Sequence, residues 1–186
     1  MAQSSLDRLQ RVRDVRVRWL SYELRPERPL TPDEEKAMRA YRMKVDQNWP
    51  HVQAMAASYG LAFGARNRNT RSRLALEGAK FAEAHGRADE YAHAMFHAHF
   101  VAGRDISDPD TLTELARHAG LDGDAFRQAL ATRAYKAQVD RELALAFTYK
   151  LSGVPAFIIG GKYLVVGAQP LENLMDVVDN VSKGGE

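Results

Sequence analysis

Hydrophobic positions near the amino terminus follow two different periods. Leu6, Leu9 and Val12 recur at intervals of three residues, which is typical of one face of a short helix. The stretch VRVRWLSYEL comes next and alternates apolar with basic or polar side chains, which is the period of a strand. The pattern therefore predicts a short helix and then a strand over about Val15–Tyr22, which Pro26 and Pro29 end.

The following hundred-odd residues have helical periodicity and clear helix starts. Thr31, Pro32 and Glu34 predict one such start, with a hydroxyl cap, a proline in the first turn and a glutamate that completes a capping box. A second helix is predicted to begin at Asn48-Trp49-Pro50 and to end near Gly60. Further helices are predicted after a cap at Asn69 or Thr70 up to Gly86, from about Ala88, over Thr111–Ala119, after a cap at Asp122 or Asp124, and over Thr132–Leu151.

The chain returns to a period of two after residue 152. Phe157–Ile159 and Tyr163–Val166 are short apolar runs rich in β-branched and aromatic residues, as in strands. Gly160-Gly161 between them predicts a two-residue hairpin, because glycine tolerates positive φ. Gly167 indicates a bulge or a close backbone approach, and Pro170 opens a last helix.

The order of these elements indicates the fold class. A helix and a strand precede the helical block, and two strands and a helix follow it. We therefore predict an α/β fold in which residues 1–29 and 152–186 form one core and residues 30–151 form a helical insertion in it.

Composition and charge exclude several classes of protein. Hydrophobic residues make up 45% and charged residues 27%, as in a soluble globular protein. The 26 basic and 24 acidic residues are interspersed, so we expect no nucleic-acid partner. No apolar run approaches the roughly 20 residues of a membrane span, and the first residues lack the apolar stretch of a secretory signal. We therefore expect no membrane partner and a cytoplasmic location.

The chain contains no cysteine. This excludes a disulfide scaffold, a thiolate metal site and any thiol chemistry by these residues themselves.

A proline stands at the entry to the first of the two late strands. Pro155 has no N–H for a sheet ladder, so a strand's first position suits it. The Val154–Pro155 bond could be trans, as most such bonds are, or cis, and the sequence spacing alone leaves both open.

Several stretches together resemble one family. GVPAFIIGGKYLVVGAQP is similar to the carboxy-terminal signature of the DsbA family, in particular its FrnE-like branch. VRVRWLSYELRPE, RNRNTRSRLALEGAKFA and FHAHFVAGRDISDPDTLTELARHAGLD extend the resemblance over nearly the whole chain, in order. The resemblance implies a thioredoxin-like fold with a large α-helical insertion, a cis Val154–Pro155 bond and a substrate groove beside it. The substrate-binding residues that it suggests are Gly153, Val154, Pro155, Asn69, Thr70 and Gln169.

One departure from the family pattern affects the chemistry. Family members carry Cys-x-x-Cys at the start of a helix that follows a first strand, and SSLDRLQRV resembles the later part of that helix. Either the sequence begins after the motif or the protein lacks it. The energetics favour the first explanation, because loss of a central strand would leave buried N–H and C=O groups unpaired at about 1–3 kcal/mol each. If the chain folds as given, we expect a homodimer that shares strands or joins sheets.

A group of histidines and a group of arginines are further candidate sites, and each has two interpretations. His93 and His97 share a helix face and could hold a metal, with His99 nearby, but no acidic residue completes the set, so we expect no metal site. Arg66, Arg68, Arg71 and Arg73 form either an anion site or a solvated basic loop.

Two pairs of polar residues, Asn69 with Thr70 and Ser4 with Ser5, are candidates for contact with glutathione. Asn69 and Thr70 either cap a helix or line a glutathione groove, as their resemblance to 2-hydroxychromene-2-carboxylate isomerases and kappa-class glutathione transferases implies. Those isomerases also use a serine, but Ser4 and Ser5 lie too late in the chain and are interpreted as a helix cap.

The leading hypothesis is a DsbA-family thiol–disulfide oxidoreductase scaffold without its redox cysteines. It would hold a protein or peptide in the groove at Val154 and would catalyse no disulfide exchange. The alternatives are a glutathione-dependent isomerase or transferase, whose glutathione binding would weaken on Asn69→Ala, and a non-catalytic peptide-binding or assembly module.

Overall fold

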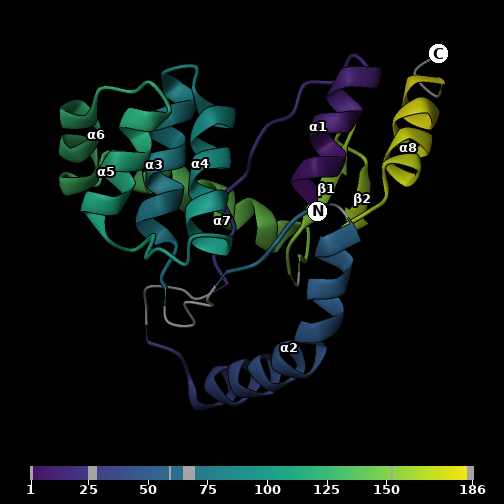
Figure 1. Ribbon diagram of the computed structural model, residues 1–186, viewed down its shortest axis with the longest axis horizontal. Helices are drawn as coiled ribbons and strands as arrows, with labels where there is room; N and C mark the ends of the chain where they lie inside the picture. Colours follow the sequence, from purple (N-terminus) through teal and green to yellow (C-terminus); the bar gives the residue numbers. More distant parts are fainter. Residues whose placement is uncertain (1, 25–28, 59, 65–69, 152, 184–186) are drawn as a thin grey trace. The chain divides into compact units, whose positions relative to one another are not determined.

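The computed structural model of the protein (Figure 1) describes residues 2–24, 29–58, 60–64, 70–151 and 153–183. These residues form α-helices and one small antiparallel sheet. The chain divides into two compact units. One unit comprises Met1–Leu20 and Ala146–Glu186, and the other comprises Ser21–Leu145.

The first unit combines two helices with a hairpin. Helix α1 (Ala2–Val12) packs against helix α8 (Leu171–Lys183), and α8 also packs on strand β1 (Ala156–Ile159). Strand β2 (Tyr163–Val166) pairs with β1 in antiparallel register, from Ala156 opposite Val166 to Ile159 opposite Tyr163. These are the terminal helices and late strands that the hydrophobic pattern predicted.

The hairpin loop is one residue longer than predicted. Gly160, Gly161 and Lys162 separate the paired residues Ile159 and Tyr163. Both glycines have positive φ, as the prediction required, and a Cβ at Gly160 would lie 2.6 Å from a methyl group of Val181 on α8. The closeness of α8, in addition to the turn itself, therefore restricts this position to glycine.

The strand predicted over Val15–Tyr22 is wrong. The sheet that the described residues form contains β1 and β2 and no other strand. Val15, Val17 and Trp19 are half-buried and the residues between them are exposed, so the alternation is real. A period of two decides which side chains share a face, but a strand also needs a neighbouring strand whose backbone groups pair with its own. Without one, this segment is not part of a sheet.

The second unit is a helical bundle. Its helices are α2 (Pro32–Ser58), α3 (Arg73–Ala84), α4 (Ala88–Phe100), α5 (Pro109–His118) and α6 (Gly123–Ala131), and helix α7 (Lys136–Thr148) begins in it. Helices α3 to α6 pack closely together (Figure 1) around a core that includes Phe81, Tyr91, Leu112 and Phe126. Aromatic contacts with edge-to-face geometry, such as that between Phe81 and Phe126 at 5.3 Å, add to the burial of apolar surface.

At three helix starts, capping residues that the sequence predicted form the expected hydrogen bonds. Thr31 and Glu34 form the predicted capping box: the Thr31 N–H donates to Glu34 Oε2 at 2.8 Å, and the Glu34 N–H donates to Thr31 Oγ1 at 3.3 Å. Asp108 caps α5, and Asp122, rather than Asp124, caps α6, each by accepting two backbone N–H groups.

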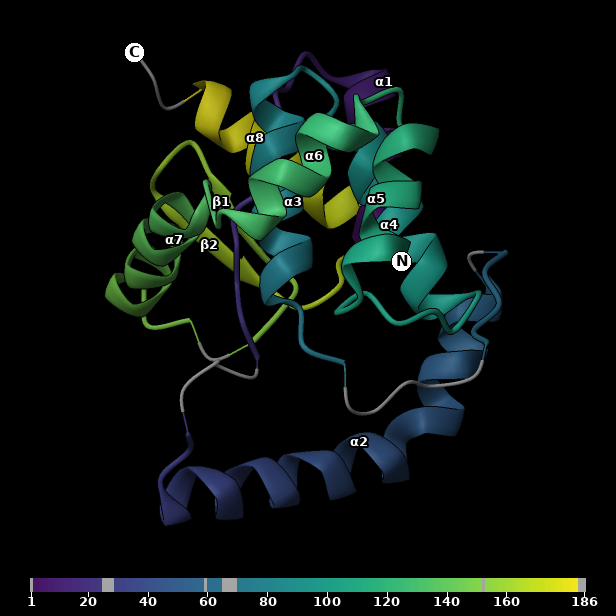
Figure 2. The ribbon, with the colours of Figure 1, turned by 90° about the vertical axis from the view of Figure 1, so that its left-hand side faces the viewer.

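Three predicted helix boundaries are wrong. Residues 32–58 form a single helix with Pro50 inside it, and Figure 2 shows that α2 changes direction along its length, as a proline that interrupts the hydrogen-bond ladder produces. Helix α7 begins at Lys136 rather than Thr132, because Arg133 takes a left-handed conformation with φ 53°. Helix α3 has Ser72, not Thr70, at its N-cap, and Asn69 lies outside the described residues.

Helix α2 is the most exposed helix of this unit. Of its residues only Ala56 is buried. The ring of Trp49 lies 4.9 Å from that of Phe63, and Phe63 in turn lies 5.9 Å from Phe100 of α4. Within the described parts of the chain, no helix is both long and apolar enough to cross a membrane.

Candidate functional site

The loop before β1 is the first candidate site. The Val154–Pro155 bond is cis, as the family resemblance implied. The carbonyl oxygen of Pro155 accepts a hydrogen bond from the N–H of Gly167 at 2.8 Å, directly beyond the last ladder pair of the hairpin. Gly167 has φ 87°, a conformation that side chains disfavour. A Cβ there would meet only Gln169 Nε2, at 3.8 Å, so the backbone conformation and not a close backbone approach accounts for the glycine.

Val154 presents both apolar and polar groups to its surroundings. The residue is 52% exposed. Its backbone N–H and C=O make no hydrogen bond with any described residue. Unpaired backbone groups at the entry to a strand, next to an exposed apolar side chain, are what an extended polypeptide needs for strand-like pairing.

Gln169, a predicted substrate-binding residue, is half-buried and makes its side-chain hydrogen bonds within the first unit. Its Nε2 donates to the Val166 carbonyl at 2.9 Å, and its Oε1 accepts from Asn173 Nδ2 at 3.1 Å. Gln169 therefore supports the hairpin beside the loop through its own polar groups.

Ser5 is a third partner of Gln169, and its predicted role is corrected. Neither Ser4 nor Ser5 caps a helix, because α1 already begins at Ala2. Ser5 is 1% exposed, and its Oγ donates to the backbone carbonyl of Gln169 at 2.8 Å. The hydroxyl thus links the first helix to the turn that precedes the last one.

The other two predicted site residues belong to another part of the chain. Thr70 lies in the second unit, whereas Gly153, Val154, Pro155 and Gln169 lie in the first. The Oγ1 atom of Thr70 is buried and has no hydrogen-bond partner among the described residues. Asn69 lies outside those residues.

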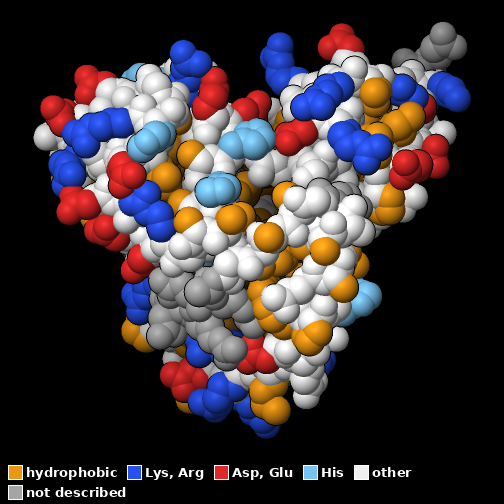
Figure 3. Space-filling view, viewed as in Figure 1, with side chains coloured by type: hydrophobic (Ala, Val, Ile, Leu, Met, Phe, Trp, Pro, Cys, Tyr) orange, Lys and Arg blue, Asp and Glu red, His pale blue; other side chains and the backbone are white. Residues whose placement is uncertain are grey.

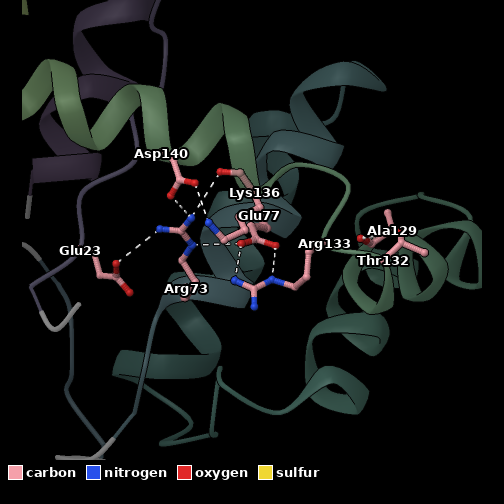
Figure 4. A network of polar contacts seen from close by, with 8 residues as sticks. All are labelled: Glu23, Arg73, Glu77, Ala129, Thr132, Arg133, Lys136 and Asp140. Carbon is pink, nitrogen blue, oxygen red and sulfur yellow. Dashed lines mark hydrogen bonds and ion pairs between the residues drawn. The ribbon is translucent and has the colours of Figure 1, made fainter. Parts of the chain in front are cut away.

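The second unit contains a cluster of buried charges that the sequence reading missed (Figure 4). Arg73 was assigned to a solvated basic loop or to an anion site, but it is only 5% exposed. Its Nε donates to Glu77 at 3.0 Å, its Nη2 donates to Asp140, and its Nη1 lies 3.6 Å from Glu23. Carboxylates of the same chain therefore occupy the positions that a bound anion would need. Arg66 and Arg68 lie outside the described residues, and Arg71 is exposed.

Glu77 lies at the centre of this cluster. It is 1% exposed and accepts two hydrogen bonds from Arg133, both at 2.8 Å, besides the one from Arg73. Burial by itself would raise the pKa of the Glu77 carboxyl, but the hydrogen bonds from Arg133 and Arg73 outweigh burial and hold that pKa below its ordinary value. Figure 4 shows the two guanidinium groups on the same carboxylate.

A second buried pair extends the cluster along α3. Lys80 donates to Glu142 at 2.9 Å and to Glu83 at 2.7 Å. The other oxygen of Glu142 accepts the backbone N–H of Ser21 at 2.7 Å. Ser21 and Glu142 lie close to the two places where the chain passes between its units, after Leu20 and after Leu145. Within the second unit, Glu142 on α7 thus binds both Ser21 and Lys80 of α3.

One sequence signal could have revealed these charges. Arg73, Glu77 and Lys80 follow each other at intervals of four and three residues, so they share one face of a helix. Apolar residues occupy much of the rest of that helix, and a charged face between apolar ones indicates buried pairing rather than solvation.

The histidines do not form a metal site in the described residues. His93 and His97 are exposed on α4, and His93 Nδ1 lies 2.7 Å from the carbonyl oxygen of Asp89. In that part of the chain, no group of three or more histidine, cysteine, aspartate or glutamate side chains is placed to hold a metal ion. The face in Figure 3 carries acidic and basic side chains interspersed, with apolar side chains exposed between them.

Comparison with known proteins adds the family context. Residues 1–179 match the DSBA-like thioredoxin domain. The chain is 35% identical over 154 residues to the uncharacterized protein YwbO of Bacillus subtilis, which covers 80% of this chain and 74% of that protein. It is 32% identical over 99 residues to the thiol:disulfide interchange protein DsbA of Azotobacter vinelandii, and spans 46% of that relative.

Solved structures show the same fold. A probable DsbA oxidoreductase from Streptomyces coelicolor superposes on all of this chain and on 85% of its own, with a TM-score of 0.83 and 26% identity. A putative protein disulfide isomerase from Nitrosomonas europaea superposes on 87% of this chain with a TM-score of 0.66 and 19% identity, a likeness of fold alone. Together these matches establish the DsbA-like thioredoxin fold, with a small sheet and a large helical part.

Proposed function

Since the chain belongs to the DSBA-like thioredoxin domain family, we propose that it binds an extended polypeptide segment at the loop Gly153–Pro155 and performs no thiol–disulfide exchange with its own residues. The observation that carries the proposal is Val154, whose backbone N–H and C=O are unpaired within the described residues and whose side chain is exposed. A polypeptide that pairs with this backbone gains main-chain hydrogen bonds without regard to its sequence.

The absence of cysteine is the reason why we propose that these residues perform no thiol–disulfide exchange. Disulfide exchange begins with the attack of a thiolate on a sulfur atom. The 186 residues supply no thiolate. The loop can therefore hold a polypeptide, but these residues cannot form a mixed disulfide with it.

Within the family, we place the chain in the FrnE-like branch. The support is the run from Gly153 to Pro170 together with the three upstream stretches that share the pattern of that branch. The Gly-Ala-Gln-Pro sequence at residues 167–170 also differs from the Gly-Gln-Asp ending typical of the related isomerases.

The peptide-binding proposal can be tested by fluorescence anisotropy with a labelled, cysteine-free peptide rich in valine and threonine. Val154→Asp should weaken binding about tenfold or more, because a carboxylate replaces the apolar contact beside the paired backbone. Val12→Asp is the matched control, since Val12 on α1 is 49% exposed and should leave the affinity unchanged. Equal affinities for the wild type and Val154→Asp would refute binding at this loop.

The proposal that the chain performs no thiol–disulfide exchange needs a separate assay. The purified chain should not accelerate the reduction of insulin by dithiothreitol, and the background rate without protein is the control. Acceleration well above that background would refute the statement that these residues perform no exchange.

Glutathione binding is a second candidate, and Thr70 is the observation that favours it. A buried hydroxyl without a partner costs free energy, and a polar ligand could satisfy it. Calorimetry at millimolar glutathione should then detect binding that Thr70→Val abolishes, while Thr132→Val, whose hydroxyl bonds to its own helix, should not affect it. No heat of binding to the wild-type chain would remove this candidate.

We also propose that two copies of the chain associate. The support is the small sheet, in which β1 pairs with β2 alone among the described residues, and the exposure of Tyr163, Leu164 and Val166 on β2. Light scattering during gel filtration should give the mass of a dimer. A uniform monomer at micromolar concentration would contradict the proposal.

A further inference from the structure

We infer that Ser5 and Gln169 are positioning residues that hold the Val154 loop in its binding conformation. The inference rests on the proposed function, because it concerns the same loop. It is carried by a continuous series of hydrogen bonds within the first unit, which runs from α1 and α8 to Pro155.

The peptide group between Val166 and Gly167 is the central link. Its N–H donates to the Pro155 carbonyl at 2.8 Å, and its carbonyl accepts from Gln169 Nε2 at 2.9 Å. One peptide plane is therefore held on both sides. Because hydrogen bonds in series polarise one another, each bond strengthens the next.

The Gln169 side chain is itself fixed in orientation. Its Oε1 accepts from Asn173 Nδ2 at 3.1 Å, one turn further along α8. This contact distinguishes the two ends of the amide, since the oxygen must face Asn173 and the nitrogen must face the Val166 carbonyl. Asn173 thus sets which group Gln169 presents to the hairpin.

Ser5 fixes the backbone of Gln169. A serine inside a helix commonly bonds to a carbonyl of its own helix, but the Ser5 hydroxyl donates to the Gln169 carbonyl, 164 residues away. Ser5 is also among the most deeply buried polar residues of the chain. Its hydroxyl therefore holds the turn before α8 against α1.

The hydrogen bonds made by Ser5 and by Gln169 together account for the position of Val154. Val154 directly precedes Pro155, and the hydrogen bond to the Pro155 carbonyl is the only backbone bond that ties the loop to β2 outside the ladder, among the described residues. If the Val166–Gly167 peptide can rotate, the Pro155 carbonyl loses its fixed donor. The exposed N–H and C=O of Val154 then lose their orientation toward an incoming strand.

The experiment compares Ser5→Ala and Gln169→Leu with two controls. Ser182→Ala removes a serine hydroxyl that, among the described residues, donates within α8 to the Val178 carbonyl at 3.0 Å. Leu174→Val reduces the packing of a fully buried α8 residue and leaves every link of the series in place. Leu174→Val thus lowers stability without acting on the loop, and it separates positioning from a general loss of stability.

Two quantities are measured at a temperature where all variants are folded. They are the affinity for the labelled cysteine-free peptide and the hydrogen-exchange rate of the Gly167 amide by NMR. Ser5→Ala and Gln169→Leu should weaken peptide binding about three- to tenfold and accelerate Gly167 exchange by a similar factor, as loss of one hydrogen bond predicts. Ser182→Ala and Leu174→Val should change the affinity less than about twofold by the same reasoning.

A conservative variant tests the orientation of Gln169. Gln169→Glu keeps an acceptor for Asn173 but removes the donor to Val166, so it should accelerate Gly167 exchange as much as Gln169→Leu does. If Gly167 exchange is unaltered in Ser5→Ala and in both Gln169 variants, the inference is wrong.

The two readouts also separate this inference from the proposed function. A wild-type chain that binds no peptide would overturn the proposed function, while faster Gly167 exchange in the variants would still support the positioning role. Peptide binding by the wild type that Ser5→Ala and Gln169→Leu leave unchanged would overturn the inference and leave the proposed function intact.

Discussion

The charge cluster around Glu77 in the second unit and the Val154 loop in the first unit differ in how their polar groups are paired. In the second unit, Arg73 and Arg133 both donate to the buried carboxylate of Glu77. In the first unit, the backbone of Val154 makes no hydrogen bond within the described residues. Burying a charge demands partners, so the paired cluster indicates a structural role. Unpaired groups at an accessible position indicate a place where something else can bind.

The contrast also separates two kinds of hydrogen-bond network. The cluster around Glu77 consists of ion pairs, and its strength depends on pH. The series from Ser5 through Gln169 to Pro155 consists of neutral groups and should be insensitive to pH over the ordinary range. The predictions that follow use this difference, from the largest expected effect on stability to the smallest.

Replacement of Glu77 should have the largest effect. Glu77→Gln leaves Arg73 and Arg133 without the carboxylate that both contact, and loss of one partner in a buried pair costs about 3 kcal/mol of the free energy of unfolding. Urea denaturation followed by circular dichroism measures it. Glu90→Gln is the control, because Glu90 forms an exposed pair with Arg87 at 2.8 Å and should cost about 0.5 kcal/mol. Similar losses in both variants would show that the cluster is not a structural centre.

A methyl group added at Gly78 should have the next largest effect. A Cβ there would lie 2.5 Å from the Tyr91 hydroxyl and 2.6 Å from the Phe126 ring. Overpacking of a core costs about 1–3 kcal/mol, and the better helix propensity of alanine offsets up to about 1 kcal/mol. Gly78→Ala should therefore destabilise the chain by about 1–2 kcal/mol in the same urea assay. Gly153→Ala, whose Cβ would meet nothing within 4 Å, should have little effect on stability. A stabilised Gly78→Ala would contradict the packing described.

The pH dependence of stability distinguishes the two networks directly. Burial raises the pKa of Glu142, but hydrogen bonds from Lys80 and from Ser21 outweigh burial and hold that pKa below its ordinary value of 4.5. A carboxyl whose pKa is lower in the folded state stabilises the fold above its unfolded-state pKa and loses that contribution as the pH falls through the folded value. The free energy of unfolding should therefore fall as the pH drops below about 4.5.

Variants sharpen this test. Glu142→Gln should be less stable than the wild type at pH 7. It should also lose less stability than the wild type when the pH falls from about 5 to about 3, which is the range in which a carboxyl with a lowered pKa takes up its proton. Ser5→Ala should change stability by the same amount at every pH in that range. A pH profile of Glu142→Gln that runs parallel to that of the wild type would show that Glu142 is not ionised in a buried pair.

Val154→Asp should have the smallest effect on stability. The side chain is exposed and its backbone has no hydrogen-bond partner among the described residues, so the free energy of unfolding should change by less than about 0.5 kcal/mol. The same variant should show the large loss of peptide affinity described above. A loss of stability comparable to that of Gly78→Ala would mean that Val154 serves the fold rather than a ligand.

Much of the fold could be predicted because its signals are local. The Thr31–Glu34 capping box, the caps at Asp108 and Asp122 and the glycines of the hairpin each depend on neighbouring residues. The predictions that failed depend on distant ones. The segment Val15–Tyr22 has the period of a strand, but whether it joins a sheet depends on another strand, which the period cannot supply.

The candidate site was predictable only in part, for the same reason. Pro155 and Val154 follow from a proline at a strand entry and from the family resemblance. The role of Gln169 does not, because its backbone is held by Ser5 on α1, 164 residues away along the chain. Arg73 was assigned to a solvated basic loop or an anion site because its neighbours in sequence are basic, whereas two of its partners, Glu23 and Asp140, are far away along the chain.

The most direct test of the central claim is an NMR titration of the ¹⁵N-labelled chain with the cysteine-free peptide. The account predicts that the largest shift changes arise at the amides of Val154, Ala156 and Gly167, and that the amide of Val154 becomes protected from hydrogen exchange when the peptide is bound. Shifts confined to the second unit, or no shifts at millimolar peptide, would contradict the claim that the backbone at Val154 receives an extended polypeptide.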